Sequence, residues 1–177
     1  MKAKIIHTKR AFAGRILDVI HQKVRLPKNG MLQFELVKRR PAVLIVPLTA
    51  PDKVLMTWQY RAALNRSILE FPGGGINPGE TLEHAACREL LEECGCLAKK
   101  IEHAGRFVTA PHFCDETYDV VFATELSFHK KQPTEREVLT NRFVLIKRLF
   151  SMADAGLICD MRTIVATGIL KKRLQTL

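Results

Sequence analysis

No uninterrupted apolar run in the 177-residue sequence approaches the length needed to span a bilayer, which excludes a protein built on membrane-spanning helices. The start of the chain, residues 1–4, also lacks the hydrophobic core of a signal peptide. The five cysteines are an odd number without the paired spacing of a zinc site, so we expect reduced thiols. Together these absences predict a cytoplasmic protein that does not enter membranes.

Repeats and low-complexity tracts are also missing. Hydrophobic residues make up 47% of the chain and charged residues 26%, which are ordinary proportions for a folded protein. The length gives room for one domain with a real core and a small additional piece.

The net charge of +10 is unevenly distributed along the chain. The first forty residues contain eleven Lys or Arg residues but only Asp18 and Glu35 as acidic residues. A basic segment of this kind can guide RNA, a membrane surface or anionic nucleotides. Its basic residues are interleaved with strand-forming apolar residues, which favours a solvated surface that steers phosphate-bearing substrates.

The same forty residues have the pattern of β structure. Asn29 and Gly30 follow a strand-like segment that ends at Leu26, and apolar residues alternate from Leu32 to Leu36. Asn-Gly between two such segments predicts a hairpin. Because a lone hairpin is not stable, it must pack on the main body or on a second subunit. We therefore expect a β subdomain at residues 1–40 and a main domain at residues 41–177.

The main domain is expected to be of the α/β class, with strands covered by helices. Ala42–Leu48 is a continuous apolar run suited to a buried strand, and Val54–Gln59 follows a turn. A helix is expected between Thr81 as its N-cap and Gly95 as its end, and a long C-terminal helix from Asp160. Further strands are expected near Arg106–Thr109, Tyr118–Ala123 and Arg142–Ile146.

The stretch from Pro72 to Cys96 carries the clearest chemical signal. A glycine-rich turn opens the predicted helix, and at 3.6 residues per turn one helix face gathers Arg88, Glu89, Glu92 and Glu93. Crowded carboxylates repel one another, so this face needs a compensating cation. Three oxygen donors on one rigid element suit Mg²⁺ or Mn²⁺. The opposite, apolar face consists of Ala86, Cys87, Leu90, Leu91 and Cys94.

The spacing of Gly74, Glu80 and the run from Arg88 to Gly95 resembles the complete signature of the Nudix hydrolases. The one soft position is Cys96, where that family usually has an aliphatic or aromatic residue. The resemblance implies an α/β/α sandwich with a mixed sheet. With the first forty residues, the expected fold is this sandwich plus a small N-terminal antiparallel β piece.

The segments around this signature resemble the ADP-ribose pyrophosphatase branch of the superfamily. They are Gln59–Arg61, Leu69–Gly74 and Ala110–Glu116. This likeness implies hydrolysis of ADP-ribose to AMP and ribose 5-phosphate, and a homodimer formed through the N-terminal β piece. Two positions depart from the branch: Gly73 replaces an alanine and His112 replaces a glycine. His112 could alter the loop, place an imidazole near the substrate, or simply lie at the surface.

The resemblance also implies a set of metal ligands. Glu89, Glu92 and Glu93 would bind the metal together with the carbonyl of Gly73. Arg88 lies four residues before Glu92 and would hold that carboxylate in position. Glu80, outside this set, would support the loop or an outer metal.

The remaining predicted site residues flank the signature. Glu116 is the candidate base that activates water, with Asp115 as its competitor. Arg61 could bind a substrate phosphate, or it could form an ordinary surface ion pair. Glu70 could accept a hydrogen bond from a nucleobase or ribose, or it could be structural.

Three functional hypotheses follow from the sequence. The first is a pyrophosphohydrolase acting on ADP-ribose. The second keeps this chemistry and changes the substrate to another sugar nucleotide, a dinucleoside polyphosphate or capped RNA. RNA is included because the first forty residues are basic, although nucleic acid is not the expected partner. The third is a non-catalytic nucleotide sensor, against which the intact set of carboxylates argues.

Overall fold

The structure is a computed structural model that describes residues 2–28, 30–129 and 139–176. The chain divides into two compact units. The first comprises residues 1–41 together with residues 107–118, and the second comprises residues 42–106 together with residues 119–177. The sequence placed residues 107–118 in the main domain, whereas the structure groups them with the first unit.

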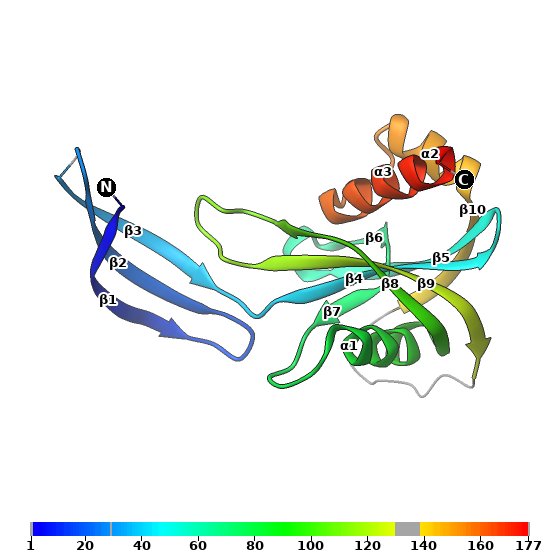
Figure 1. The fold of residues 1–177 in the computed structure, drawn as a ribbon, viewed down its shortest axis with the longest axis horizontal. Coiled ribbons are helices and arrows are strands. Elements are labelled where there is room, and N and C mark those ends of the chain that lie inside the picture. Colours follow the sequence, from blue (N-terminus) through cyan, green and yellow to red (C-terminus); the bar gives the residue numbers. More distant parts are fainter. Residues whose placement is uncertain (1, 29, 130–138, 177) are drawn as a thin grey trace. The chain divides into compact units, whose positions relative to one another are not determined.

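The first unit contains a three-stranded antiparallel sheet in the order β1-β2-β3 (Figure 1). Gly30 pairs with Leu26 at the turn, which confirms the predicted hairpin, although Asn29 itself lies outside the described residues. Ile20 and Val24 are buried, whereas every residue of β1 is exposed. The strands are β1 (Lys4–Ala13), β2 (Asp18–Leu26) and β3 (Gly30–Lys38).

The second unit is built on a seven-stranded sheet with a central order of β10-β5-β4-β9-β8. A short strand, β6, pairs with β5, and another, β7, pairs with β4. The strands are β4 (Ala42–Ala50), β5 (Lys53–Arg61), β6 (Arg66–Glu70), β7 (Gly73–Gly75), β8 (Cys96–Val108), β9 (Thr117–Phe128) and β10 (Leu139–Leu145).

Helices cover both faces of this sheet (Figure 1). One face carries α1, whose last residue continues into a π-helical turn, η2, and the other face carries α2 and α3. This layering confirms the predicted α/β/α sandwich. The helices are α1 (Leu82–Glu89), η2 (Leu90–Cys94), α2 (Ile146–Asp154) and α3 (Met161–Gln175), and a short 3₁₀ turn, η1 (Ala62–Leu64), follows β5.

The apolar run in β4 is buried on both faces of the sheet, as a continuous hydrophobic segment predicts. Val43 and Ile45 pack in the same cluster as Ala85 and Leu90 of the helix that carries the carboxylates. The alternate residues of β4 point to the other face and are also buried. Because β4 and this helix share one core, the sheet holds the helix rigidly.

Local signals place the helix ends where the sequence predicts them. The Thr81 hydroxyl accepts a hydrogen bond from the His84 N–H at 3.2 Å, and Gly95 ends the helix with φ +64°. Asp160 caps α3 in the same way as Thr81. The sequence did not reveal α2, or the part of β8 before Arg106, where Lys99 and Lys100 interrupt the apolar pattern.

The described part of the chain contains no helix that is long and apolar enough to cross a membrane. All five cysteines are described, and all are free thiols, as predicted.

Candidate active site

The glycine-rich segment that leads into α1 is fixed to the central strand of the sheet. Gly73, Gly74 and Gly75 form β7 and pair with the first three residues of β4. The Pro72 carbonyl also accepts a hydrogen bond from the Ile45 N–H at 2.9 Å. The loop therefore follows β4 closely and presents its backbone to the helix carboxylates.

Arg88 links the loop, the helix start and the helix end. Its Nε and Nη2 donate to the two oxygens of Glu80 at 2.8 and 3.0 Å. Its Nη1 donates to Glu89 at 2.7 Å, and Nη2 also donates to the Gly75 carbonyl at 2.9 Å. The predicted pair with Glu92 is present at 3.5 Å. The hydrogen bonds that Arg88 donates to Glu80, and then to Glu89, raise its pKa, so this cation is permanent.

Glu80 is the main anchor of Arg88. The guanidinium, and next the backbone N–H of Asn77, lower the pKa of Glu80 to about 2. The contact therefore stabilises the loop in the ionised form of the carboxylate. This arrangement agrees with the loop-supporting role that the resemblance implies for Glu80.

The lowered pKa of Glu80 predicts an acid-dependent loss of stability. The unfolded chain binds the proton at the ordinary pKa near 4.5, above that of the folded chain. The contribution of this contact is therefore complete above that pH and disappears as the pH falls toward 2. Thermal unfolding of the protein and of Glu80→Gln, compared between about pH 6 and pH 2, should show a difference that shrinks on acidification. A difference that is constant with pH would contradict this.

Two of the three predicted metal-binding carboxylates are buried against the loop. The side chain of Glu93 accepts a hydrogen bond from the Gly73 N–H at 3.0 Å, and Glu89 lies against the backbone of Gly74. Glu92 is more accessible, with 43% of its side chain exposed. The loop thus covers two carboxylates that the sequence predicted on one polar face of the helix.

The apolar face predicted for the helix needs one correction. Ala86, Leu90 and Cys94 are buried as expected, but Leu91 is 38% exposed and Cys87 is half-buried. The predicted faces assumed 3.6 residues per turn throughout, whereas Leu90–Cys94 is a π-helical turn. The wider turn accounts for the exposure of Leu91, whereas Cys87 lies before it in α1.

Gly74 is required because a side chain there would meet Glu89. A Cβ atom at this position would lie 2.4 Å from Glu89 Oε1, and this carboxylate is itself held by Arg88. We expect Gly74→Ala to displace the carboxylate and lower kcat by about a hundredfold, with little change in Tm. Gly75→Ala is the matched control, since its Cβ would meet nothing within 4 Å. Equal kinetics for the two variants would show that the position of Glu89 is unimportant.

The donor set at the loop fits a hard divalent cation. It offers carboxylate oxygens, and the absent Cβ of Gly74 leaves the Glu89 carboxylate room beside the backbone. Among the described residues, however, no three His, Cys, Asp or Glu side chains are already grouped as a metal site. Arg88 and the Gly73 N–H hold Glu89 and Glu93 instead. The chemistry fits, and the metal ligands stay a prediction.

Arg61 and Glu70, both predicted to bind substrate, form an ion pair at the ends of β5 and β6. Arg61 Nη2 lies 2.6 Å from Glu70 Oε1, and Arg162 donates to Glu70 Oε2 at 2.9 Å. Glu70 is fully buried, and burial raises its pKa although both cations oppose the shift. Glu70 is thus a partner of two arginines, while the Arg61 side chain keeps 33% exposure.

Arg162, the second arginine that binds Glu70, was not identified from the sequence. Its Nε donates to Asp160 at 2.8 Å, and the neighbouring Thr163 hydroxyl accepts a hydrogen bond from the Phe71 N–H at 3.1 Å. The start of α3 therefore fixes Phe71, the residue before Pro72. The sequence did contain one signal for Arg162: it lies two residues after Asp160, the predicted N-cap of α3.

The predicted base and its competitor lie in the first unit, on the loop before β9. Glu116 is buried, and its Oε1 lies 3.0 Å from Arg39 Nη1. Asp115 forms an ion pair with Lys38 and accepts a hydrogen bond from the Arg39 N–H at 3.0 Å. Burial alone would raise the pKa of Asp115, but these contacts outweigh burial and lower it. Both carboxylates therefore have cationic partners.

His112, the departure in this loop, is exposed and packs its ring edge-on against Phe113, with ring centroids 4.7 Å apart. The exposure of His112 agrees with the surface alternative, and a contact with the substrate stays a prediction.

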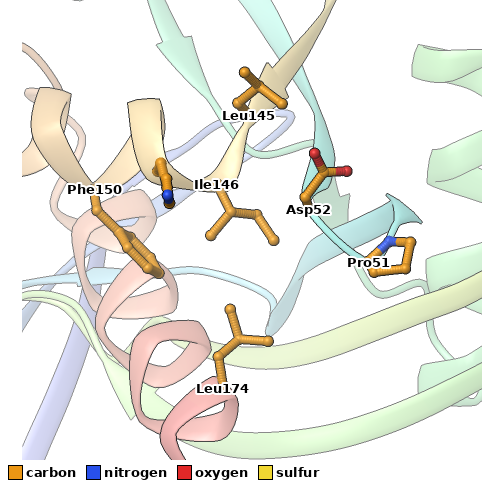
Figure 2. A pocket seen from close by; sticks show the side chains of 7 residues that line it. Pro51, Asp52, Leu145, Ile146, Phe150 and Leu174 are labelled. Carbon is orange, nitrogen blue, oxygen red and sulfur yellow. The ribbon is translucent and has the colours of Figure 1, made fainter.

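A separate cavity of about 470 Å³ lies between the β4–β5 turn, α2 and the end of α3 (Figure 2). Its walls are mainly apolar, with Asp52 and Lys147 as the charged members. No residue from the stretch Pro72–Cys96 lines it, so this cavity is separate from the cluster of carboxylates around Arg88. The lining residues are Pro51, Asp52, Leu145, Ile146, Lys147, Phe150 and Leu174.

Comparison with known proteins places this fold and site in a family. The model of the NUDIX domain matches residues 38–161, and the chain belongs to this family of hydrolases. It is 32% identical to the ADP-ribose pyrophosphatase of Bacillus subtilis (strain 168), over 97% of this chain and 94% of that protein.

Two further proteins show the range of the similarity. The methanol dehydrogenase activator of Bacillus methanolicus is 36% identical over 70% of this chain and 67% of its own length. The crystal structure of an ADP compounds hydrolase aligns with a TM-score of 0.88 at 22% identity, covering 99% of this chain and 96% of that one. The latter supports the fold, including the N-terminal sheet and the mixed sheet with its helices.

Proposed function

We propose that the protein is a metal-dependent pyrophosphohydrolase that converts ADP-ribose to AMP and ribose 5-phosphate. The observation that carries the proposal is the intact cluster around Arg88, with Glu89 and Glu93 buried against the glycine loop. The ADP-ribose pyrophosphatase similar to it over nearly the whole chain supports this choice of substrate.

In the proposed reaction the oxygen of water bonds to one phosphorus of the diphosphate. The bond from that phosphorus to the bridging oxygen breaks, and the bridging oxygen leaves with the other phosphate. Glu116 accepts a proton from the attacking water. When bound, Mg²⁺ or Mn²⁺ neutralises the charge that develops on the phosphate oxygens. The chain's own residues must therefore hold the cation and place the base.

The metal-binding role is proposed for Glu89, Glu92 and Glu93, together with the Gly73 carbonyl. Arg88 keeps the helix start and the loop together while it balances part of their negative charge. Glu92, the most accessible of the three, can turn toward a cation with the least rearrangement.

Arg61 is proposed to bind a substrate phosphate through the exposed part of its guanidinium. Glu70 then acts by orienting Arg61, since it is fully buried and already bound by two arginines. This assignment changes the expected role of Glu70 from direct recognition to support.

We also propose a homodimer formed through the first unit, in a cytoplasmic protein. On β1, a strand of mixed polar and apolar residues, Phe12 is 56% exposed and Ile5 is 59% exposed, which leaves apolar surface that a second chain could cover. Five free thiols suit a reducing compartment. Light scattering at the mass of two chains supports the dimer, and the mass of one chain refutes it.

A substrate panel tests the proposed activity. The purified chain, with Mg²⁺ or Mn²⁺, is assayed against ADP-ribose, GDP-mannose, NADH, diadenosine polyphosphates and capped RNA. We expect the highest kcat/KM for ADP-ribose. A higher value for another substrate would keep the hydrolase and replace its substrate, and tight binding without turnover would indicate a nucleotide sensor.

Capped RNA is the alternative that the basic first forty residues keep open. Some of those cations are already paired, for example Arg10 with Asp18 and Lys38 with Asp115. Binding of RNA that weakens steeply with salt would support this alternative. Cleavage confined to small nucleotides would remove it.

A further inference from the structure

The end of β3 is joined along its backbone to the loop that carries Glu116. The Val37 N–H donates to the Phe113 carbonyl at 2.7 Å, and the Val37 carbonyl accepts from the Asp115 N–H at 3.3 Å. Val37 and Cys114 form a parallel bridge. The end of β3 and the loop residues 113–115 are therefore held together by backbone hydrogen bonds within the first unit.

Two consecutive cations follow Val37 and pair with the two consecutive carboxylates of the loop. Lys38 pairs with Asp115, which also accepts the Arg39 N–H, so Asp115 is bound from both the side chain and the backbone. Arg39 pairs with Glu116 at 3.0 Å. The first pair lies at the surface, with about half of each side chain exposed, and the second reaches the buried side chain of the proposed base.

Glu116 is enclosed by few polar groups. Only 9% of its side chain is exposed, and its Oε2 accepts a hydrogen bond from the Thr109 hydroxyl at 3.4 Å. A carboxylate buried to this degree needs a counter-charge, and Arg39 supplies it. One oxygen forms the ion pair with Arg39, without hydrogen-bond geometry, and the other accepts the hydrogen bond from Thr109, so the two oxygens have different partners.

We propose that Arg39 is a positioning residue for Glu116 in hydrolysis. This inference rests on the proposed function, in which Glu116 takes the proton of the attacking water. Arg39 acts through the carboxylate: it keeps Glu116 oriented and compensates its charge. The N-terminal sheet then contributes to turnover through the end of β3, besides any role in assembly.

The experiment compares Arg39→Met with Lys38→Met under saturating Mg²⁺, with ADP-ribose as substrate. Each variant removes one charge and one ion pair to the same loop. We expect Arg39→Met to lower kcat between about ten- and a hundredfold with little change in KM, because only the base is affected. Arg39→Lys should recover part of the loss, and Lys38→Met should retain kcat within about threefold.

A double variant separates positioning from other roles. If Arg39 acts through Glu116, Arg39→Met combined with Glu116→Gln should be no slower than Glu116→Gln alone. Additive losses, a raised KM with unchanged kcat, or equal losses for Arg39→Met and Lys38→Met would each overturn the proposal. Thermal unfolding identifies variants that fail to fold; if Arg39→Met is among them, Arg39→Lys must show the loss in kcat at unchanged KM, and wild-type kcat would overturn the proposal.

Different results would refute the hydrolase function and the positioning role of Arg39. Absence of turnover in the unaltered protein on every substrate would end the proposed function. Normal turnover in Glu116→Gln, alongside loss of turnover in variants of the helix carboxylates, would leave the hydrolase in place and overturn the role of Arg39.

Discussion

Replacing Glu93 with glutamine is expected to lower kcat by on the order of a thousandfold, the size of losing a central electrostatic group. Glutamine keeps the shape and can still accept the hydrogen bond from the Gly73 N–H, so the fold should survive. It removes the charge that a divalent cation needs. Glu92→Gln should have a similar effect, measured as kcat with Mg²⁺ and checked by thermal unfolding.

The control for this pair is Glu83→Gln. Glu83 lies in the first turn of the same helix and is exposed, so its replacement removes an equal charge without touching the loop. We expect it to retain kcat within about threefold, as exposed charges contribute little. Near-normal turnover in both Glu92→Gln and Glu93→Gln would refute the metal assignment.

Arg88→Met is the second large effect, and it should reduce both stability and turnover. The variant leaves Glu80 and Glu89 without their shared cation, and the Glu89 side chain is only 10% exposed. Breaking a buried ion pair from one side costs about 3 kcal/mol. We expect a loss of that order in the free energy of unfolding, measured by urea denaturation, and at least a hundredfold loss in kcat.

The double variant Arg88→Met/Glu80→Gln tests the reason for the stability loss. Removing the charge of Glu80 as well should restore part of the stability, because one uncompensated carboxylate disappears. It should not restore turnover, since Glu89 still lacks its partner. Full additivity of the two stability changes would contradict a coupled cluster.

The parts of the fold that the sequence predicted are those encoded locally. Thr81 and Gly95 delimit the carboxylate helix because a cap and a left-handed glycine act on their nearest neighbours. The same is true of Asp160 at the start of α3. The buried strand at Ala42–Leu48 followed from its continuous apolar run. Each signal needs only a few adjacent residues.

What the sequence could not show depends on residues far apart in the chain. Arg162 meets Glu70 across 92 positions, and Lys38 meets Asp115 across 77. No local pattern encodes such pairs, so the partners of Glu70 and Asp115 appeared only in the structure. The π-helical turn was missed for a different reason: the predicted helix faces assumed a constant 3.6 residues per turn, which cannot reveal a local change of pitch.

In the candidate site, too, local spacing identified the residues, whereas their contacts appeared only in the structure. The spacing of Gly74, Glu80 and Arg88 identified the residues of the cluster, but not that Glu80 is the main partner of Arg88. That contact requires the loop between them to fold back on the helix. The substrate-binding predictions for Arg61 and Glu70 rested on looser likeness, and the structure adds that the two form one ion-paired group.

The most direct measurement is the product analysis of ADP-ribose turned over in H₂¹⁸O with Mg²⁺. We expect equal amounts of AMP and ribose 5-phosphate, with one ¹⁸O atom in a phosphate of one product, and on the order of a thousandfold less of both from Glu93→Gln. Absence of these products, or full product formation by Glu93→Gln, would contradict it.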